Sequence, residues 1–205
     1  MKLPPRTVER LSKYRRLLSK YKETDGEHIY SHNLARLLNL TPEQVRRDLM
    51  LIGHTGNHRR GYSIEALIDR IGKIIDSNET QNIAIVGIGN LGRAVTTFIR
   101  KADTQLKIVA CFDADFSKTN NEIVGIQCYH TSEIPEKVKM LDISMAILTV
   151  PPDAAVGVTK ILTDAGIKGI LNFTSVHLDV PESVYLKDYD IITSLEEIGF
   201  FIRHV

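Results

Sequence analysis

A glycine-rich turn between an apolar run and a helix-like run constrains the fold of this chain more than any other feature. In IAIVGIGNLGRAV (83–95), Gly87, Gly89 and Gly92 have the spacing G-x-G-x-x-G. In this motif the first glycine allows a tight turn, the second lets a pyrophosphate approach the backbone, and the third lets the helix pack on the sheet. Unpaired N–H groups at the helix N-terminus then attract phosphate. The stretch predicts a dinucleotide-binding turn, because it follows an apparent strand and opens an apparent helix.

The segments after the turn alternate between strand and helix patterns. Continuous apolar strands separated by helices indicate a parallel sheet covered on both faces. We therefore predict an α/β, doubly wound, Rossmann-like domain. Its expected strands are 82–87, 107–113, 126–130, 143–151 and 168–173, and its expected helices run to residue 100, around 133–141 and over 153–165.

Asp113 closes the second predicted strand, 26 residues after Gly87. A carboxylate at this place can accept hydrogen bonds from the adenosine ribose hydroxyls. It would also repel a 2′-phosphate, so NAD(H) is favoured over NADP(H). A Rossmann-like domain that has lost its ligand or binds another nucleotide is the alternative.

The segment before the turn has a different pattern. PPRTVERLSKYRRLLSKY (4–21) places Val8, Leu11, Tyr14 and Leu18 at helical spacing. Two short helices are expected next, at 31–39 and 41–51, followed by a hairpin over 54–64, a linking helix over 64–76 and a domain boundary at 77–82. We expect Ser31 to cap the first short helix.

The second short helix has a well-marked start. Thr41 is expected to cap it, with Pro42 at its first position and Gln44 completing a capping box. The residues Val45, Leu49 and Ile52 fall on one face, which we expect to be buried.

Two helices joined by a tight turn and followed by a hairpin indicate a winged helix-turn-helix. Gln44, Arg46 and Arg47 stand where a recognition helix meets base edges and phosphates, and Arg59 and Arg60 stand at the hairpin tip. Residues 1–78 hold 15 Lys and Arg against 9 Asp and Glu, while the rest of the chain is acidic. A basic first third favours a DNA partner, and a small helical interaction domain with solvated arginines is the alternative.

Several other classes of protein are disfavoured. No apolar run approaches the roughly 18 residues that a membrane span needs, and no signal peptide opens the chain. The two cysteines, Cys111 and Cys128, suggest a reducing compartment, so we expect the cytoplasm. His28 and His32 have no third ligand nearby, and no metal is expected. His130 and His177 lie near strand ends and are the candidate general bases, but no substrate domain follows them, so catalysis is disfavoured.

The chain closes on DIITSLEEIGFFIRHV (190–205), which reads as an apolar helix. Ile191, Leu195, Ile198, Ile202 and Val205 form one helical stripe. Such a helix must be buried either on its own sheet or in a partner. Exchange between two protomers would suit a DNA-binding dimer.

The order of these parts resembles the Rex family of redox-sensing transcriptional repressors over essentially the whole chain. The resemblance is carried by QVRRDL, the GY at 61–62, VGIGNLGRAV, FDAD, ILTVP, AGIKGILNF and the tail. It implies a homodimer with swapped C-terminal helices that binds operator DNA when NADH is scarce and leaves it when NADH rises. It also implies an interprotomer ion pair between Arg16 and Asp190. NADH or NAD⁺ would be the sensed ligand, and no enzymatic activity would be expected.

With the resemblance, the candidate residues become two sets. The cofactor set is Gly87, Ile88, Gly89, Asn90, Leu91, Gly92, Ala94, Phe98, Asp113, Thr149, Val150, Pro151, Asn172 and Ile191. The DNA set is Thr41, Gln44, Arg46, Arg47, His54, His58, Arg59, Arg60, Gly61 and Tyr62.

The chain departs from the family pattern at three places. MLIGHTGNHRRGY (50–62) replaces the usual aromatic pair and glycine-rich basic wing, which puts the common operator in doubt. Phe98 stands for the usual tyrosine beside the nicotinamide, and Ile191 for the usual aromatic on the swapped helix. We expect a retained cofactor cleft with a weaker or retuned switch, as in a divergent paralogue.

These inferences give three expected regions: a winged helix at 1–78, a Rossmann-like NAD(H) domain at 79–190 and a dimerisation helix at 191–205. Two other functions stay open at this point. One is an NAD-dependent oxidoreductase with an accessory N-terminal domain, and the other is a winged-helix regulator that senses another nucleotide.

Overall fold

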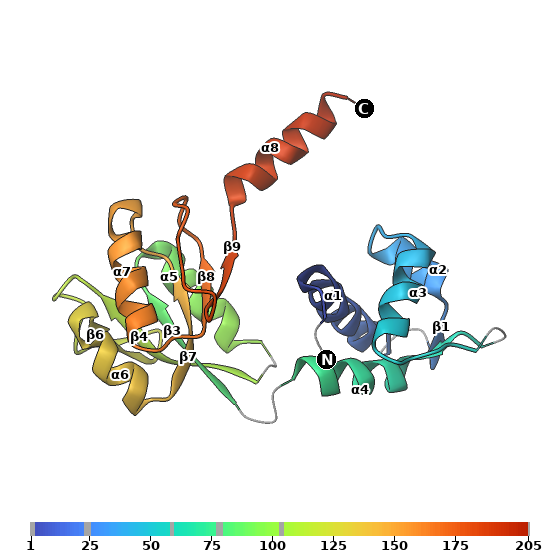
Figure 1. Ribbon diagram of the computed structural model, residues 1–205, viewed down its shortest axis with the longest axis horizontal. Helices are drawn as coiled ribbons and strands as arrows, with labels where there is room; N and C mark the ends of the chain where they lie inside the picture. Colours follow the sequence, from blue (N-terminus) through green and yellow to red (C-terminus); the bar gives the residue numbers. More distant parts are fainter. Residues whose placement is uncertain (1–2, 23–25, 58–59, 77–79, 103–104, 205) are drawn as a thin grey trace. The chain divides into compact units, whose positions relative to one another are not determined.

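The chain divides into two compact units, Met1–Asn78 and Glu79–Val205. They are seen in a computed structural model that describes residues 3–22, 26–57, 60–76, 80–102 and 105–204 (Figure 1). Each unit has its own buried core, and each is described by itself below.

The first unit is a small helical domain with a two-stranded ribbon. Its elements are α1 (Pro5–Lys22), β1 (His28–Ile29), α2 (Ser31–Leu37), α3 (Pro42–Leu51), β2 (Tyr62–Ser63) and α4 (Ile64–Ile75). Strands β1 and β2 pair antiparallel, and an isolated bridge joins Asn57 to Gly61. Residues 58 and 59, at the tip of the predicted hairpin, lie outside the described residues.

The core of this unit confirms most of the predicted helix faces. Val45, Leu49 and Ile52 are fully buried, as expected. The predicted face of α1 is wrong at Val8, which is 39% exposed, while Thr7 is buried in its place. Helix α4 is more than a connection, since the residues Ile64, Leu67 and Ile71 lie in the core of this unit.

The structure differs from the sequence prediction in the cap residue of α2 and in the capping box of α3. Ser31 is the first residue of α2 and not its cap; Tyr30 takes the cap position and makes no side-chain cap bond. Thr41 does cap α3, because its hydroxyl accepts a hydrogen bond from the backbone N–H of Gln44 at 3.2 Å. The predicted capping box is wrong, because the Gln44 side chain donates instead to Asp48.

The second unit contains the predicted parallel sheet. Its strands are β3 (Gln81–Val86), β4 (Leu106–Asp113), β5 (Glu122–Ile123), β6 (Ile126–His130), β7 (Ile143–Leu148), β8 (Gly169–Asn172) and β9 (Tyr185–Asp188). The spatial order is β5-β6-β4-β3-β7-β8-β9, and only β5 runs antiparallel to its neighbour. Without β5 this is the 3-2-1-4-5-6 order of a doubly wound dinucleotide-binding sheet.

Helices cover the two faces of this sheet (Figure 1). Val95 and Ile99 of α5 (Asn90–Arg100) pack on the face that carries Ile83, Ile85 and Cys111. The opposite face is covered by α6 (Ile134–Met140), which follows the short 3₁₀ turn η1 (Thr131–Glu133), and by α7 (Pro152–Asp164). The reversal of strand order between β3 and β7 marks the switch point at which such sheets bind ligands.

Helix α8 (Ile191–Ile202) has no buried residue. Its stripe residues Ile191, Leu195 and Ile198 are 49%, 58% and 54% exposed, and Phe200, Phe201 and Ile202 are exposed as well. Burial of this helix on its own sheet, one of the two expected possibilities, is therefore not seen.

Candidate functional site

The turn after β3 lies at the switch point and needs its glycines. Gly87 has a φ of +90°, and a Cβ there would lie 2.7 Å from the Thr149 carbonyl oxygen. A Cβ on Gly92 would lie 2.2 Å from the Gly87 carbonyl oxygen. A Cβ on Gly89 would meet no described atom within 4 Å, so this position opens onto space that a ligand can use. The three positions have the properties that a pyrophosphate turn requires.

Thr149 ties the end of β7 to this turn. Its hydroxyl donates to the Gly87 carbonyl at 2.7 Å and to the Val86 carbonyl at 3.1 Å. Its amide also donates to the Val86 carbonyl at 2.8 Å. The predicted residues Val150 and Pro151 follow directly, and Pro151 occupies the cap position of α7. Thr149 therefore acts in the structure as the residue that holds the turn in shape.

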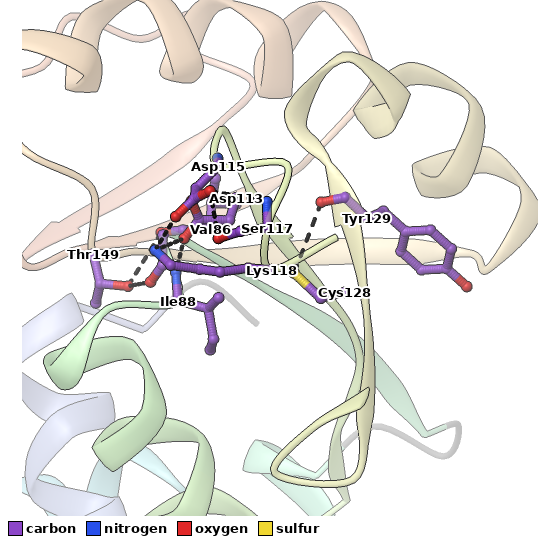
Figure 2. A network of polar contacts seen from close by, with 10 residues as sticks. Val86, Ile88, Asp113, Asp115, Ser117, Lys118, Cys128, Tyr129 and Thr149 are labelled. Carbon is purple, nitrogen blue, oxygen red and sulfur yellow. Dashed lines mark hydrogen bonds and ion pairs between the residues drawn. The ribbon is translucent and has the colours of Figure 1, made fainter. Parts of the chain in front are cut away.

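Asp113 lies at the end of β4 and is held by three donors (Figure 2). Its Oδ2 accepts from the Ile88 amide at 2.9 Å and from the Lys118 ammonium at 3.0 Å, and its Oδ1 accepts from the Asp115 amide at 2.9 Å. Burial alone would raise the pKa of Asp113, but these hydrogen bonds outweigh it and hold the pKa below its ordinary value. The site thus keeps an ionised carboxylate beside the glycine turn.

Lys118 is the residue of this site that sequence reasoning missed. Its ammonium also lies 3.8 Å from Asp115 Oδ2. The only sequence signal is a lysine five positions after Asp113, within FDADFSK (112–118). Spacing alone does not show that the loop after β4 folds back so that this lysine meets the carboxylate.

Asn172, the last residue of β8, is committed to its own chain. Its amide nitrogen donates to the Val176 carbonyl at 3.0 Å and to Asp188 Oδ1 at 2.8 Å. Its oxygen accepts from the Thr174 amide and hydroxyl at 2.9 and 2.7 Å. The side chain is 1% exposed and fastens β9 and the loop before it, so a direct contact with a cofactor stays a prediction.

The other cofactor candidates lie on the exposed side of α5 and at the start of α8. Leu91, Ala94 and Phe98 face outward from α5, and Phe98 is 72% exposed.

Asp190, one member of the predicted interprotomer ion pair, caps α8. Its carboxylate accepts from the amides of Ile192 and Thr193 at 2.9 and 3.1 Å and from the Thr193 hydroxyl at 2.7 Å. Its predicted partner Arg16 is exposed on α1.

The two candidate general bases have ordinary surroundings. His130 Nδ1 lies 2.8 Å from Ser132 Oγ, and its ring stacks on Phe116 with 4.1 Å between centroids. His177 is exposed. Within the described ranges, no group of three or more His, Cys, Asp and Glu side chains could hold a metal ion.

The predicted DNA residues gather around α3 and the ribbon of the first unit. Arg46 donates to Glu43 at 2.6 Å and to the Ser31 hydroxyl at 3.2 Å. It lines a hollow of about 240 Å³ together with Tyr30, Ser31, Gly56, Asn57, Gly61 and Tyr62. Arg47 and Arg60 are exposed, whereas His58 and Arg59 lie outside the described residues.

His54 and Gly61 both contact residues of the two-stranded ribbon. Burial and the nearby Arg70 charge lower the pKa of His54, whose ring is tilted against Tyr62 at 6.0 Å. Gly61 has a φ of +75°, and a Cβ there would lie 2.6 Å from the Ile29 carbonyl oxygen. Only a glycine at position 61 allows the backbone of β1 to lie this close to it.

Comparison with known proteins covers both units. Residues 2–49 match a family model described as "Putative DNA-binding protein N-terminus", and residues 78–176 match one described as "CoA binding domain". No helix among the described residues has the length and apolar character to cross a membrane.

Full-length relatives share one name. The chain is 34% identical to the redox-sensing transcriptional repressor Rex of Leuconostoc citreum, over 98% of this chain and 93% of that protein. It is also 34% identical to that of Anoxybacillus flavithermus, over 99% and 95% of the two chains.

Solved structures agree with these relatives. The crystal structure of RSP, a Rex-family repressor, matches with a TM-score of 0.88 at 26% identity, over 100% of this chain and 95% of the other. A second structure, of RSP with β-NAD⁺ and operator DNA, matches with the same TM-score at 28% identity, over 100% and 94%. With a nucleotide turn in one unit, a helix-turn-helix in the other and full-length relatives above 30% identity, the chain belongs to the Rex family of redox-sensing transcriptional repressors.

Proposed function

We propose that this protein is a repressor that senses the NADH/NAD⁺ ratio, binding operator DNA when NADH is low and leaving it when NADH rises. The observation that carries the proposal is the glycine turn with its anchored Asp113 in a chain that is similar throughout to Rex repressors. Crystal structures of RSP contain β-NADH in one case and β-NAD⁺ with operator DNA in another. The relatives of this chain are transcriptional repressors, which are regulators rather than enzymes.

The cofactor would bind across the ends of β3, β4 and β7. Gly89 gives the pyrophosphate room, the N-terminus of α5 faces it, and Asp113 accepts from the ribose hydroxyls. Ala94 and Phe98 on α5 would lie beside the nicotinamide. Phe98 has no hydroxyl, so fewer polar contacts are left to distinguish NADH from NAD⁺.

The exposed apolar helix α8 supports a homodimer. A stripe of this kind is rarely left in water by a protein of this size. We propose that α8 packs against a second copy, where Ile191 would approach the partner's cofactor, and that Arg16 and Asp190 pair between protomers in the DNA-bound form. A protein that binds operator DNA must share its compartment, so we propose the cytoplasm as its location.

One titration tests the central claim. Operator DNA is first selected from random duplexes, and labelled operator is then titrated with protein at several fixed NADH concentrations. If NADH binding and DNA binding are coupled as strongly as two sites in a protein usually are, saturating NADH should lower operator affinity by roughly 5- to 150-fold. We expect the low end of this range, because Phe98 has no hydroxyl and Ile191 has no aromatic ring to offer the nicotinamide. Superimposable curves would contradict the proposal, as would the absence of duplex binding at low salt.

A further inference from the structure

A fully buried carboxylate lies at the centre of the helix-turn-helix unit. Asp48, on α3, is 0% exposed. Arg10 of α1 holds it with two hydrogen bonds, from Nε to Oδ2 at 2.6 Å and from Nη2 to Oδ1 at 2.7 Å. The Tyr14 hydroxyl donates to Oδ2 at 2.8 Å, and Gln44 Nε2 donates to Oδ1 at 3.0 Å.

The chemistry of Asp48 decides which way the Gln44 amide points. A guanidinium is always protonated, and its paired hydrogen bonds favour the ionised carboxylate. An ionised carboxylate only accepts hydrogen bonds, so the amide of Gln44 must turn its nitrogen toward Asp48. With the oxygen in that place, two acceptors would face each other inside the protein. Asp48 thereby prevents the amide from flipping.

The oxygen of the same amide is left for another donor. Among the residues that the structure describes, none donates a hydrogen bond to Gln44 Oε1. Gln44 is half-buried on the first turn of α3, three positions before the exposed Arg47. A recognition helix uses its first turns to reach base edges in the major groove.

Only two bases offer a donor in the major groove. Adenine presents its N6 amino group and cytosine its N4 amino group, whereas guanine and thymine offer acceptors at the corresponding positions. A glutamine that can flip is able to meet either kind of group. We propose that Gln44 reads a base with an exocyclic amino group by accepting a hydrogen bond at Oε1, and that Asp48 sets this preference by holding Nε2. The inference rests on the proposed binding of operator DNA.

The experiment compares wild-type protein with Gln44→Met on selected operators. Methionine keeps the length of the side chain and leaves Asp48 its bonds from Arg10 and Tyr14. Selection on random DNA should show one position in each half-site where wild type prefers A or C and the variant has no preference. At that position, replacing adenine by purine, or cytosine by 2-pyrimidinone, removes only the amino group. This should weaken wild-type binding roughly 3- to 10-fold in one half-site and leave the variant unaffected.

Two further variants separate reading from stability. Tyr14→Phe removes a different hydrogen bond from the same carboxylate and should keep the base preference. Asp48→Asn gives Gln44 a neighbour that can donate or accept, so it should let G or T be accepted as well. The melting temperature shows whether Asp48→Asn folds, and the comparison of Gln44→Met with base analogues stands without it.

Several results would overturn the inference. A Gln44-dependent position that prefers G or T would do so, as would selection of the same operator by Gln44→Met and wild type. An equal effect of the missing amino group on both proteins would also contradict it. Wild-type protein that selects no sequence at all would instead contradict the proposed function.

Discussion

The Lys118 ammonium lies 3.0 Å from the Asp113 carboxylate, so the carboxylate that would bind the cofactor's ribose already forms an ion pair within its own chain. The Asp113 side chain is 11% exposed and that of Lys118 is 30% exposed, which leaves the pair only partly screened by water. Asp113 therefore repels a 2′-phosphate less than an unpaired carboxylate would. Charge repulsion by Asp113 therefore contributes less to the predicted preference for NADH over NADPH than the sequence alone indicates.

Replacing Lys118 by methionine should widen the preference for NADH over NADPH. Without the ammonium, Asp113 and Asp115 present uncompensated negative charge to the 2′-phosphate. We expect the ratio of the two dissociation constants to rise roughly fivefold, about 1 kcal/mol for a partly exposed pair. Nicotinamide fluorescence titrations measure both constants. Asp113→Asn should narrow the ratio, and an equal change for both cofactors in Lys118→Met would assign Lys118 a structural role only.

Asp190 serves two purposes in our proposal, and its variants should separate them. Its carboxylate caps α8, and its charge would pair with Arg16 of a second protomer. Asp190→Asn keeps a good cap without the charge, whereas Asp190→Ala removes both. Both should weaken operator binding, by roughly 5-fold or more if the pair contributes to coupling. Only Asp190→Ala should reduce helix content by circular dichroism.

The same variants test the pairing with Arg16. If the ion pair forms, Arg16→Gln combined with Asp190→Asn should weaken operator binding no more than either change alone. NADH affinity of the protein without DNA should stay unchanged or rise slightly, because whatever disfavours the DNA-bound form helps the ligand of the other form. Strictly additive effects would contradict the pair.

A glutamate in the apolar stripe of α8 should dissociate the proposed dimer. Leu195→Glu places a charge where a leucine would be buried in the partner, and each copy loses about 1.5–3 kcal/mol of apolar burial. With two copies per interface, the dissociation constant should rise at least ~100-fold. Sedimentation equilibrium measures this, with Glu196→Gln on the same helix as the control. A wild-type monomer would contradict the proposed assembly.

The buried Asp48 should make the stability of the first unit depend on pH. Burial would raise the pKa of Asp48, but its bonds to Arg10, Tyr14 and Gln44 hold the pKa below the ordinary 3.8. A carboxyl group with a lowered pKa in the folded state stabilises that state above its ordinary pKa, and the stabilisation is lost as the pH falls through the lowered value. Asp48→Asn should cost about 3–5 kcal/mol at neutral pH, because Arg10 loses its buried partner.

Urea unfolding at a series of pH values checks this dependence. The difference between wild type and Asp48→Asn should be constant from pH 7 to about 5 and shrink below about 4. Asp69→Asn, at an exposed carboxylate of α4, is the control. A difference that stays constant down to pH 3 would show that Asp48 has the same pKa in the folded and the unfolded protein.

Local patterns in the sequence determined the elements and much of the cofactor turn. Gly87 and Gly92 could be recognised because tight turns and close packing demand glycine wherever they occur. Asp113 could be placed at a strand end, and Thr41 at a helix start, because strand periodicity and capping act over a few residues. The short edge strands β5 and β9 were missed, since two residues give no period and β9 is mostly exposed and polar.

The partners of these residues were decided only by the tertiary structure. Nothing in the sequence indicates that Asp48 pairs with Arg10, which lies 38 positions away. Nor does the sequence show that the Gln44 side chain donates to this buried carboxylate instead of completing a capping box. The loop after β4 brings Lys118 back to Asp113, and the end of β8 brings Asn172 against Asp188. The physical reason is common to all of them. A buried polar group must find partners, and the packing of distant segments, not their spacing along the chain, determines which groups are within reach.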